Sequence, residues 1–365
     1  MSGLLAGLLI DFSSCITDLE TAIMHRRSMA TIREVAARAR VSTATVSHVL
    51  NQIIFVSPRL KARVLKAVDE MNYHPNAMAR SLRTMKSKTV GMIIPDITNP
   101  FFPAVVRGAE DVLSRAGYTL IVGNSDYLIE KEETYYRTLT AKRVDGLLLE
   151  ITPVTPPPYL LRHDFERTPV VYIDRFYRNF RGDAVLVDNY SGSLDAVTHL
   201  IEAGHRRIGI ITGPLNMTMA RRRLKGYEQA LRRHGLKRDP NLVREGRFDL
   251  DSGYTQSKTL LTLNERPTAL YISNGLMTMG CTRALDELGL RCPENVALIS
   301  FDDLQAFEVM HPTISAVIQP TYEMGSTAAN LLLKRITGGA GIPTQHKVLK
   351  TRLAIRGSSL QTQAG

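Results

Sequence analysis

Residues 29–51 read MATIREVAARARVSTATVSHVLN, and this stretch predicts two short helices joined by a tight turn. Thr31 is a suitable N-cap with Glu34 three residues later, as in a capping box, and apolar residues then recur at helical spacing. The turn falls at residues 40–42, and a second helix follows over residues 43–50. A third helix begins near Pro58, because proline suits a first helical turn. Three short helices with a tight turn between the first two predict a helix-turn-helix.

The exposed face of the second helix is predicted to carry side chains that are small or form hydrogen bonds. Such side chains suit close approach to base edges in the major groove of DNA. These residues are Thr43, Ala44, Thr45, Ser47 and His48. The third helix carries basic residues that could hold phosphates or simply be solvated. An ordinary three-helix segment is the alternative.

The basic charge of the chain is concentrated in the same region. Residues 29–88 carry a formal net charge of +8, against +11 for all 365 residues. A small basic module attached to a nearly neutral body is typical of a nucleic-acid-binding protein. A well-solvated basic surface would produce the same charge.

The cysteines and the first residues of the chain indicate in which cell compartment the protein lies. The three cysteines include no C-x-x-C pair, which argues against a disulfide framework and a structural zinc site and fits a reducing cytoplasm. Residues 3–10 are apolar, but no basic residue precedes them and Asp11 interrupts them, so export is disfavoured. We expect a cytoplasmic protein without metal or cofactor, in which residues 1–28 are a disordered or mis-assigned extension.

From Thr89 onward, apolar runs of strand length alternate with helical stretches. Fully apolar strands separated by helices predict a parallel sheet covered on both faces, and two such series predict two similar lobes. A ligand cleft is expected between the lobes, beyond the carboxyl ends of the strands. The predicted strands are 90–95, 118–123, 144–149, 169–173, 207–212, 269–272 and 296–301, and the predicted helices are 101–113, 131–143, 224–234 and 278–288. The fold class is therefore α/β, with a small all-α helix-turn-helix domain followed by a two-lobed parallel α/β sandwich.

An enzyme of the same architecture is the next alternative. The sequence contains no G-x-G-x-x-G, no phosphate-binding loop, no H-E-x-x-H and no G-x-S-x-G. Its Asp, His and Ser residues form no recognisable nucleophile or metal set. We therefore assign no catalytic residue and expect no enzymatic activity.

The helix-turn-helix segment resembles the N-terminus of the lactose/galactose-repressor (LacI/GalR) family, and within it the purine and ribose repressors. The residues that carry this resemblance are 29–36, 41–51, 55–57, 72–76 and 79–83. The resemblance extends to about residue 357, through the strings at 95–102, 142–147, 204–208, 300–303 and 318–320. It implies that the larger domain is similar to periplasmic sugar-binding proteins, with two lobes interleaved in sequence.

The resemblance also implies domain boundaries. The helix-turn-helix domain would cover residues 29–75, a hinge helix or linker 76–88, and an effector-binding and dimerisation domain 89–365. In that domain the N-lobe would comprise about 89–187 and 319–349, and the C-lobe about 188–318 and 350–357. The absence of a heptad pattern after residue 357 favours a dimer over a tetramer.

For DNA binding, the resemblance implies that residues 76–82 form a hinge helix only on DNA, where Leu82 wedges into the minor groove. A segment this short is marginal as an isolated helix, and a flexible basic linker is the alternative. The DNA-binding residues expected are Thr31, Ser42, Thr43, Ala44, Thr45, Ser47, His48, Asn51, Asn76, Ala79, Arg80 and Leu82. Arg40 stands where many relatives have glycine in the turn.

For effector binding, the resemblance implies a clamping arginine, polar partners for hydroxyls and aromatic faces. Glu150 is added because it ends the third predicted strand. The set is Phe101, Phe102, Glu150, Asp174, Arg223, Phe248, Asn274, Asp302 and Gln319.

Structural roles remain open for most of this set. Asp302 could cap a helix, Gln319 could be a crossover residue, Phe101 and Phe102 could belong to the core, and Asp174 could merely pair with its neighbour Arg175.

Two departures from the family pattern lie in this domain. Gly275 replaces an acidic residue that caps the next helix in relatives. Met217 and Met219 stand where the purine repressor has polar ligand contacts, which disfavours a purine effector.

Together these observations predict a cytoplasmic, homodimeric repressor that binds operator DNA and is controlled by a small molecule, a sugar or sugar derivative. Two other functions stay open. One is a DNA-binding regulator with a non-sugar or protein effector, or with none. The other, much less favoured, is a solute-binding protein, which would show no affinity for DNA.

Overall fold

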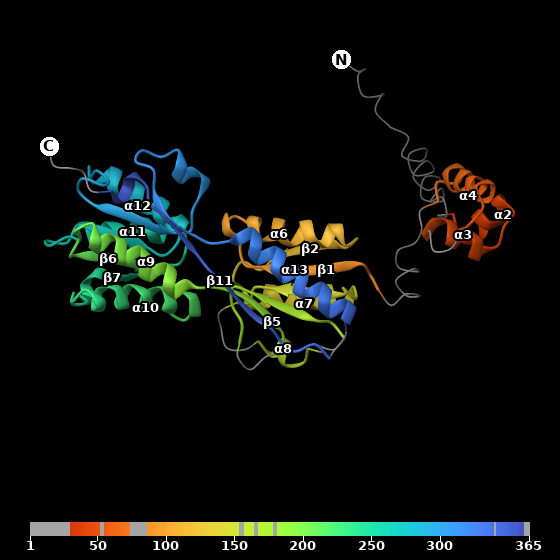
Figure 1. Cartoon of the computed structure of the whole chain (residues 1–365), viewed down its shortest axis with the longest axis horizontal. Helices are drawn as coiled ribbons and strands as arrows, with labels where there is room; N and C mark the ends of the chain where they lie inside the picture. Colours follow the sequence, from red (N-terminus) through yellow and green to blue (C-terminus); the bar gives the residue numbers. More distant parts are fainter. Residues whose placement is uncertain are drawn as a thin grey trace, which may run out of the picture. The chain divides into compact units, whose positions relative to one another are not determined.

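The computed structural model describes residues 30–51, 55–73, 86–152, 157–163, 167–177, 181–338 and 341–360. The chain divides into two compact units, residues 1–85 and 86–365 (Figure 1). The predicted extension 1–28 and the hinge residues Asn76, Ala79, Arg80 and Leu82 lie outside the described residues.

The first unit contains the three predicted helices, α2 (Ile32–Ala39), α3 (Thr43–Asn51) and α4 (Pro58–Glu70). Thr31 and Glu34 form the predicted capping box, since the Glu34 backbone N–H donates to Thr31 Oγ1 at 3.3 Å and the Thr31 N–H to Glu34 Oε2 at 2.6 Å. The apolar faces of the helices meet in a small core, whose fully buried side chains include Val35, Val46 and Val64.

The turn between α2 and α3 depends on Arg40 and on α4. Arg40 has φ 49° and ψ 54°, so the backbone is left-handed there. The Arg63 guanidinium on α4 donates to the carbonyl oxygens of Ala39 at 2.5 Å and Arg40 at 3.1 Å. One basic residue of the third helix therefore holds the turn together, in place of the purely solvated or phosphate-binding role expected for it.

The second unit consists of two six-stranded sheets with the same strand order. The first is β11-β5-β4-β3-β1-β2 and the second β12-β10-β9-β8-β6-β7, so β1 to β5 correspond one by one to β6 to β10. All neighbouring strands are parallel except β10 and β12. The strands of the first sheet are β1 (Thr89–Ile94), β2 (Thr119–Asn124), β3 (Gly146–Leu149), β4 (Val170–Ile173), β5 (Asp183–Val187) and β11 (His346–Leu349). Those of the second are β6 (Ile208–Thr212), β7 (Val243–Glu245), β8 (Ala269–Ile272), β9 (Ala297–Phe301), β10 (Ser315–Ile318) and β12 (Arg352–Ala354).

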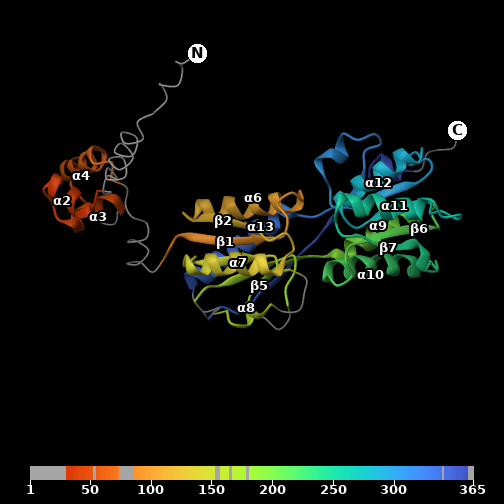
Figure 2. The ribbon, with the colours of Figure 1, turned by 180° about the vertical axis from the view of Figure 1, so that it is seen from behind.

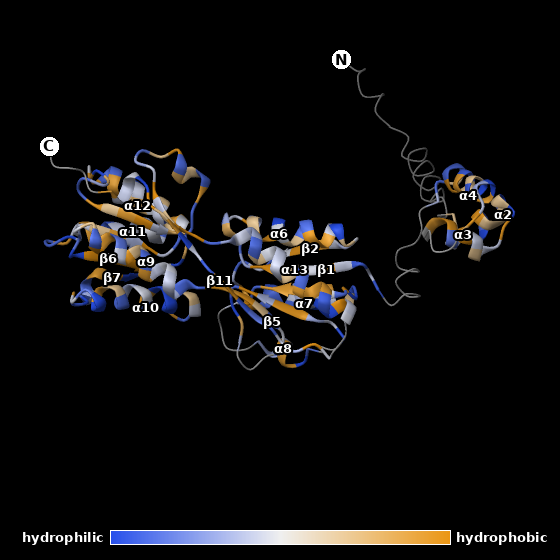
Figure 3. Cartoon of the chain, viewed as in Figure 1, coloured by the Kyte–Doolittle hydropathy of each residue, from blue (hydrophilic) through white to orange (hydrophobic). Residues whose placement is uncertain are grey.

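Helices cover both faces of each sheet, as buried parallel strands require (Figure 2). On the first sheet, α6 and α13 pack on one face and α7 and α8 on the other. On the second sheet, α9 and α10 cover one face and α11 and α12 the other. The helices are α6 (Phe101–Arg115), α7 (Ile129–Ala141), α8 (Pro158–Leu161), α9 (Asn189–Glu202), α10 (Thr218–Arg233), α11 (Leu250–Leu261), α12 (Gly275–Glu287) and α13 (Thr321–Gly338). Most strands between these layers are hydrophobic along their length (Figure 3).

The chain passes three times from one sheet to the other. It does so between β5 and α9, between β10 and α13, and between β11 and β12. One predicted boundary is wrong: α10 begins at Thr218 and not near Leu224. The run Arg221-Arg222-Arg223 hid the first turns, because it has no apolar periodicity.

The first residues of the second unit are fastened to the first sheet by Asp145, which lies just before β3. Its Oδ1 accepts from the Ser87 backbone N–H at 2.7 Å and from Ser87 Oγ at 2.9 Å, and its Oδ2 accepts from the Lys88 N–H at 3.1 Å. The Lys88 ammonium lies 4.3 Å from the centre of the Tyr118 ring. The segment that leads into β1 therefore has a fixed place on this lobe.

Two glycines allow the backbones of α6 and α13 to pack in direct contact. A Cβ at Gly108 would lie 2.0 Å from the Tyr322 carbonyl oxygen, and one at Gly325 would lie 1.9 Å from that of Val105. The helix backbones are therefore in direct contact at this crossing, and no side chain fits between them.

We predict that Gly325→Ala destabilises the second unit by about 2 kcal/mol, because the added methyl group forces the packed helices apart. The measurement is urea unfolding of the full chain, followed by circular dichroism. Gly338→Ala is the matched control on the same helix, since a Cβ there meets only the end of the Ile342 side chain. It should change the free energy of unfolding by less than about 0.5 kcal/mol, and equal losses in both variants would contradict the explanation.

Candidate functional site

The first candidate site is the outer surface of α3. Ser42, Thr43 and Ala44 are exposed, and Thr45 and His48 are half-buried. Ser42 Oγ accepts from the Thr45 N–H at 3.1 Å and lies 2.9 Å from Thr45 Oγ1, so these two hydroxyls already contact each other. Thr31 is exposed at the start of α2.

One residue of the predicted DNA-reading face is misplaced. Ser47 is only 7% exposed, so it is not on the open face. The reason is helical geometry: position 47 is one step beyond Val46, which is completely buried, and falls at the border of the core-facing side. The side chain of Asn51 lies outside the described residues.

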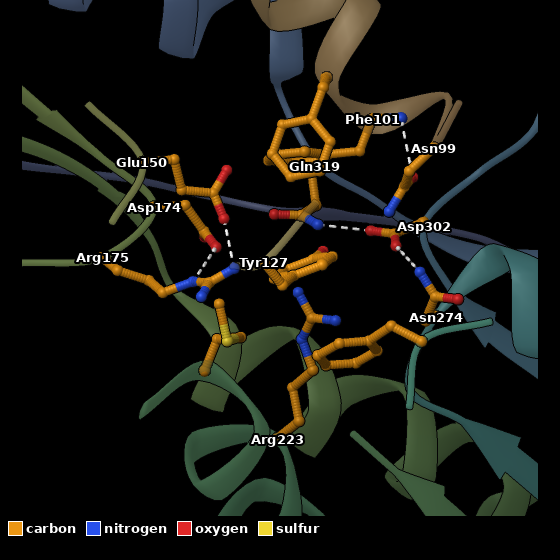
Figure 4. Close-up of a pocket in the computed structure, with 13 residues that line it drawn as sticks. Asn99, Phe101, Tyr127, Glu150, Asp174, Arg175, Arg223, Asn274, Asp302 and Gln319 are labelled. Atoms are coloured by element: carbon orange, nitrogen blue, oxygen red, sulfur yellow. Dashed lines mark hydrogen bonds and ion pairs between the residues drawn. The ribbon is translucent and has the colours of Figure 1, made fainter. Parts of the chain in front are cut away.

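The second candidate site is a pocket between the two lobes (Figure 4). It encloses about 330 Å³ of empty space, part of it open to solvent. All nine residues that the sequence predicted for the effector line it: Phe101, Phe102, Glu150, Asp174, Arg223, Phe248, Asn274, Asp302 and Gln319. Four further residues also line it: Asn99, Tyr127, Arg175 and Met219. Of these, the family resemblance had placed only Met219 at a position of ligand contact.

Corresponding loops of the two lobes form this pocket. Each lining residue follows the carboxyl end of a strand or lies on the helix after it, as expected for open parallel sheets. Asp174 follows β4, and Asp302 follows the corresponding strand β9. Their backbone N–H groups make equivalent bonds, to Val185 O at 2.8 Å and to Val317 O at 3.0 Å.

Four lining residues have left-handed backbones. The φ angles are 58° at Tyr127, 62° at Asp174, 65° at Phe248 and 75° at Asp302. Such conformations are costly and cluster at binding and active sites, where the surrounding structure enforces them. The Phe248 ring lies so close to Gly213 that a Cβ there would be 1.9 Å from its Cζ. The backbone thus fixes the directions of two acids and two aromatic rings.

On the C-lobe side, Arg223 is buried and held from three directions. Its Nε donates to Asn189 Oδ1 at 2.7 Å, its Nη1 donates to the Ser273 carbonyl oxygen at 2.5 Å, and its guanidinium lies 3.7 Å from the centre of the Phe301 ring. An arginine fixed in this way presents a rigid cation to the pocket.

Asp302 is neither isolated nor a helix cap. Its carboxylate accepts hydrogen bonds from Gln319 Nε2 and, at 3.3 Å, from Asn274 Nδ2. Asn274 also caps α12, because its Oδ1 accepts from the Met277 N–H at 3.0 Å. The cap that Gly275 was expected to lack is therefore supplied by Asn274. A Cβ on Gly275 would lie 2.8 Å from Leu304 Cγ, so glycine leaves room for that leucine.

On the N-lobe side, Glu150, Asp174 and Arg175 are buried together. Arg175 Nη2 donates to Glu150 Oε1, and Nη1 donates to the Ile151 carbonyl oxygen at 3.2 Å. Asp174 Oδ2 is 3.8 Å from Arg175 Nε, so the main partner of Arg175 is Glu150 and not its sequence neighbour. Burial raises the pKa of Glu150 to about 8 despite the nearby arginine, and it raises the pKa of Asp174 as well.

Several buried polar atoms of the pocket have no hydrogen-bond partner among the residues that the structure describes. They are Glu150 Oε2, Asp174 Oδ1, Arg175 Nε and Gln319 Oε1. Unsatisfied buried polar atoms are costly, and a group of them at one cavity is explained by a polar ligand.

The aromatic residues have two roles. Phe101 and Phe102 contact each other edge to face, with ring centres 4.9 Å apart, and both belong to the buried core of the N-lobe. They also line the pocket, so the core and ligand-facing roles coexist. Tyr127 and Met219 belong to one apolar cluster that also includes Phe248.

The described part of the chain contains no group of three or more His, Cys, Asp or Glu residues placed to hold a metal ion. None of its helices is long and apolar enough to cross a membrane. Cys281 and Cys292 are both free thiols.

Comparison with known proteins identifies the two units. Residues 31–76 match the family described as bacterial regulatory proteins, lacI family, and residues 197–359 match the periplasmic binding protein-like domain. The chain is 40% identical to the HTH-type transcriptional repressor PurR of Haemophilus influenzae (strain PittEE), over 85% of this chain and 92% of that protein. It is 39% identical to the ribose operon repressor of Escherichia coli (strain K12), over 85% of this chain and 94% of that protein.

Among solved structures, the Lac repressor dimer bound to operator and the anti-inducer ONPF is similar, with a TM-score of 0.81 and 27% identity. The match covers 91% of this chain and 99% of that chain. Fold and relatives together define a DNA-binding transcriptional repressor and not an enzyme. The chain belongs to the lacI family of bacterial regulatory proteins.

We predict that Arg40→Gly stabilises the helix-turn-helix by about 1 kcal/mol, because glycine adopts the left-handed backbone without a clash of its Cβ. Hydrogen exchange of the full chain, read by mass spectrometry on peptides from α2 and α4, should slow about fivefold. Arg40→Ala is the control, because it removes the same charge but keeps a Cβ and should give no such slowing. Equal slowing in both variants would show that the charge, and not the backbone, is responsible.

Proposed function

We propose that this protein is a cytoplasmic repressor that binds operator DNA as a homodimer and is controlled by a sugar or sugar derivative bound between its lobes. The observation that carries the proposal is the interlobe pocket, where unpartnered buried polar atoms lie beside aromatic rings. Hydroxyl groups both donate and accept hydrogen bonds, and the apolar face of a sugar ring packs against aromatic side chains.

A purine effector is less well supported. Met219 lines the pocket and Met217 lies in the same apolar cluster, so this wall has thioethers where a purine base would need polar partners. A sugar needs fewer directed contacts from this wall, because its polar partners are available on the opposite one.

Support for a homodimer comes from apolar side chains on exposed surfaces of both lobes. On the N-lobe, Ile121 and Val122 of the edge strand β2 are exposed, as is Leu128 just beyond it. On the C-lobe, Leu250 at the start of α11 is exposed. A second copy of the chain would cover both surfaces by two-fold symmetry and protect the open strand edge.

Effector binding would act on DNA through the linker that precedes β1. Closure of the lobes on a ligand would change the position of the N-lobe in each subunit. Because Asp145 fastens residues 87 and 88 to that lobe, the linker would follow this movement, and the spacing of the two DNA-binding units would change. The effector then alters DNA affinity by its differential affinity for the two states.

The proposal predicts that one member of a panel of sugars and sugar phosphates changes operator affinity at least tenfold, which is about 1.4 kcal/mol of coupling. The measurement is fluorescence anisotropy with a palindromic duplex that has a central C-G step, and sedimentation should give two chains per duplex. Arg223→Ala should abolish the response, because the buried cation that faces the ligand is lost. Arg222→Ala, an exposed neighbour on the same helix, is the control and should keep it.

Two outcomes would count against the proposal. Absence of specific operator binding with and without ligands would refute DNA control. Tight binding that no panel member changes would favour a constitutive or protein-controlled regulator.

The linker attachment gives a separate prediction. Asp145→Ala should leave effector affinity within about twofold of wild type, because Asp145 is remote from the pocket, but should reduce a tenfold response of DNA affinity to less than threefold. Calorimetry measures the first quantity and anisotropy the second. Asp111→Ala is the control, since Asp111 pairs with Arg107 and Tyr322 in the same lobe and does not contact the linker. A full response in Asp145→Ala would rule out this route.

A further inference from the structure

The N-lobe wall of the pocket contains more acceptor capacity than the chain uses. Glu150 and Asp174 have side chains only 2% and 7% exposed. Each carboxylate has one oxygen without a hydrogen-bond partner in the described parts of the chain, Oε2 of Glu150 and Oδ1 of Asp174. Gln319 adds an unpartnered amide oxygen at the same pocket. Three of the four unsatisfied atoms are therefore acceptors, and the fourth is the Nε–H of Arg175.

The positive charges that line the pocket are already engaged. Arg175 donates to Glu150 and to the Ile151 carbonyl oxygen, and Arg223 donates to Asn189 and the Ser273 carbonyl oxygen. The lining contains three carboxylates and two guanidinium groups, so its formal charge is negative when all are ionised. Arg175 Nε has no hydrogen-bond partner but lies 3.8 Å from Asp174 Oδ2, so an anion bound there would lie next to that carboxylate.

These two facts discriminate between classes of ligand. A hydroxyl group can donate a hydrogen bond to a carboxylate without adding a charge to the pocket. A phosphate or carboxylate group is ionised at neutral pH and offers mainly acceptors, and its charge disfavours ionisation of the neighbouring Glu150 and Asp174, whose pKa values burial has already raised.

On the basis of the proposed function, we propose that the pocket selects an uncharged, hydroxyl-rich sugar over its phosphorylated or acidic derivatives. Glu150, held by Arg175, is the residue that determines this choice. The two residues act as a unit: Arg175 orients the Glu150 carboxylate, and Glu150 in turn keeps the arginine from serving as an anion site.

The ionisation of Glu150 gives a second readout. Arg175 faces its carboxylate from the loop after β4, together with Asp174; Glu132 faces it from α7, and Tyr127 from the loop after β2. Burial raises the pKa of Glu150 to about 8 in the absence of ligand. A hydroxyl that donates to Glu150 favours the ionised form and lowers this pKa, so binding releases a proton. The Kd should therefore decrease as the pH rises from 6.5 to 8.5.

The test is calorimetry of the full chain with matched pairs: ribose and ribose 5-phosphate, glucose and glucose 6-phosphate, galactose and galacturonate. In any pair with a binding member, we expect the uncharged sugar to bind at least tenfold more tightly. Glu150→Gln should reduce this preference at least tenfold, because the freed Arg175 becomes available to an anion, and should abolish proton release. The number of protons released is obtained from the heats in buffers of different ionisation enthalpy.

Glu133→Gln is the matched control. Glu133 forms an exposed ion pair with Arg137 at 2.6 Å in the same lobe, so the chemical change is identical but remote from the pocket. The preference of Glu133→Gln for the uncharged sugar and its proton release should equal those of wild type. Operator binding by Glu150→Gln and Glu133→Gln reports that the variants are folded.

Each possible result decides a different claim. Tighter binding of the phosphorylated or acidic member by wild type would overturn the inference but leave the effector-controlled repressor intact. Binding without proton release, or an unchanged preference in Glu150→Gln, would overturn the role of Glu150. A panel in which no member of any pair binds would overturn the sugar effector of the proposed function and this inference with it.

Discussion

The pocket and its chemistry depend on one constraint: two parallel sheets of identical strand order meet at their carboxyl ends. Three chain crossings, at β5–α9, β10–α13 and β11–β12, join the lobes at this junction. Loops that follow corresponding strands therefore meet in one cavity, and polar residues that are far apart in sequence become neighbours. Asp174 and Asp302 illustrate this, since each follows the same strand of its own sheet and each has a left-handed backbone.

Burial then determines what these neighbours can do. In water, solvent would screen the charges of Glu150 and Arg175, and water molecules could replace either side chain as the partner of the other. In the protein both side chains are almost completely buried. The arginine compensates only part of the cost of burying the acids, so the pKa of Glu150 stays above its ordinary range. Oxygens left without partners make this wall a receptor for hydrogen-bond donors. The C-lobe wall differs, because Asp302 is bound by two amides and Arg223 by an amide oxygen and a carbonyl oxygen.

The sequence predicted the helix-turn-helix and seven of the strands because both leave strong local signals, a capping box and apolar runs. It did not predict β5, β7, β10, β11 or β12. The sequence also predicted residues that line the pocket: Glu150 from its place at the end of a predicted strand, and Asn274 from the family resemblance. Ser47 was misassigned because helical spacing alone does not settle a border position. Tyr127 has no pattern that marks it as a lining residue, and the start of α10 was hidden by a run of arginines.

The pairing of Glu150 with Arg175 could not be predicted from neighbours in sequence, because it depends on the register of two strands. Arg175 was considered only as a partner for its neighbour Asp174, yet its closer partner is Glu150, and Asp174 Oδ2 lies 3.8 Å from Arg175 Nε. In the register of β3 and β4, Leu149 lies opposite Tyr172, so the residues just after the two strands emerge side by side at the sheet end. An acid directly after β3 and a base two residues after β4 are therefore brought together by the sheet itself. Their pairing follows from the register and is present without a ligand. The pair can therefore select between uncharged and anionic ligands as they enter the pocket.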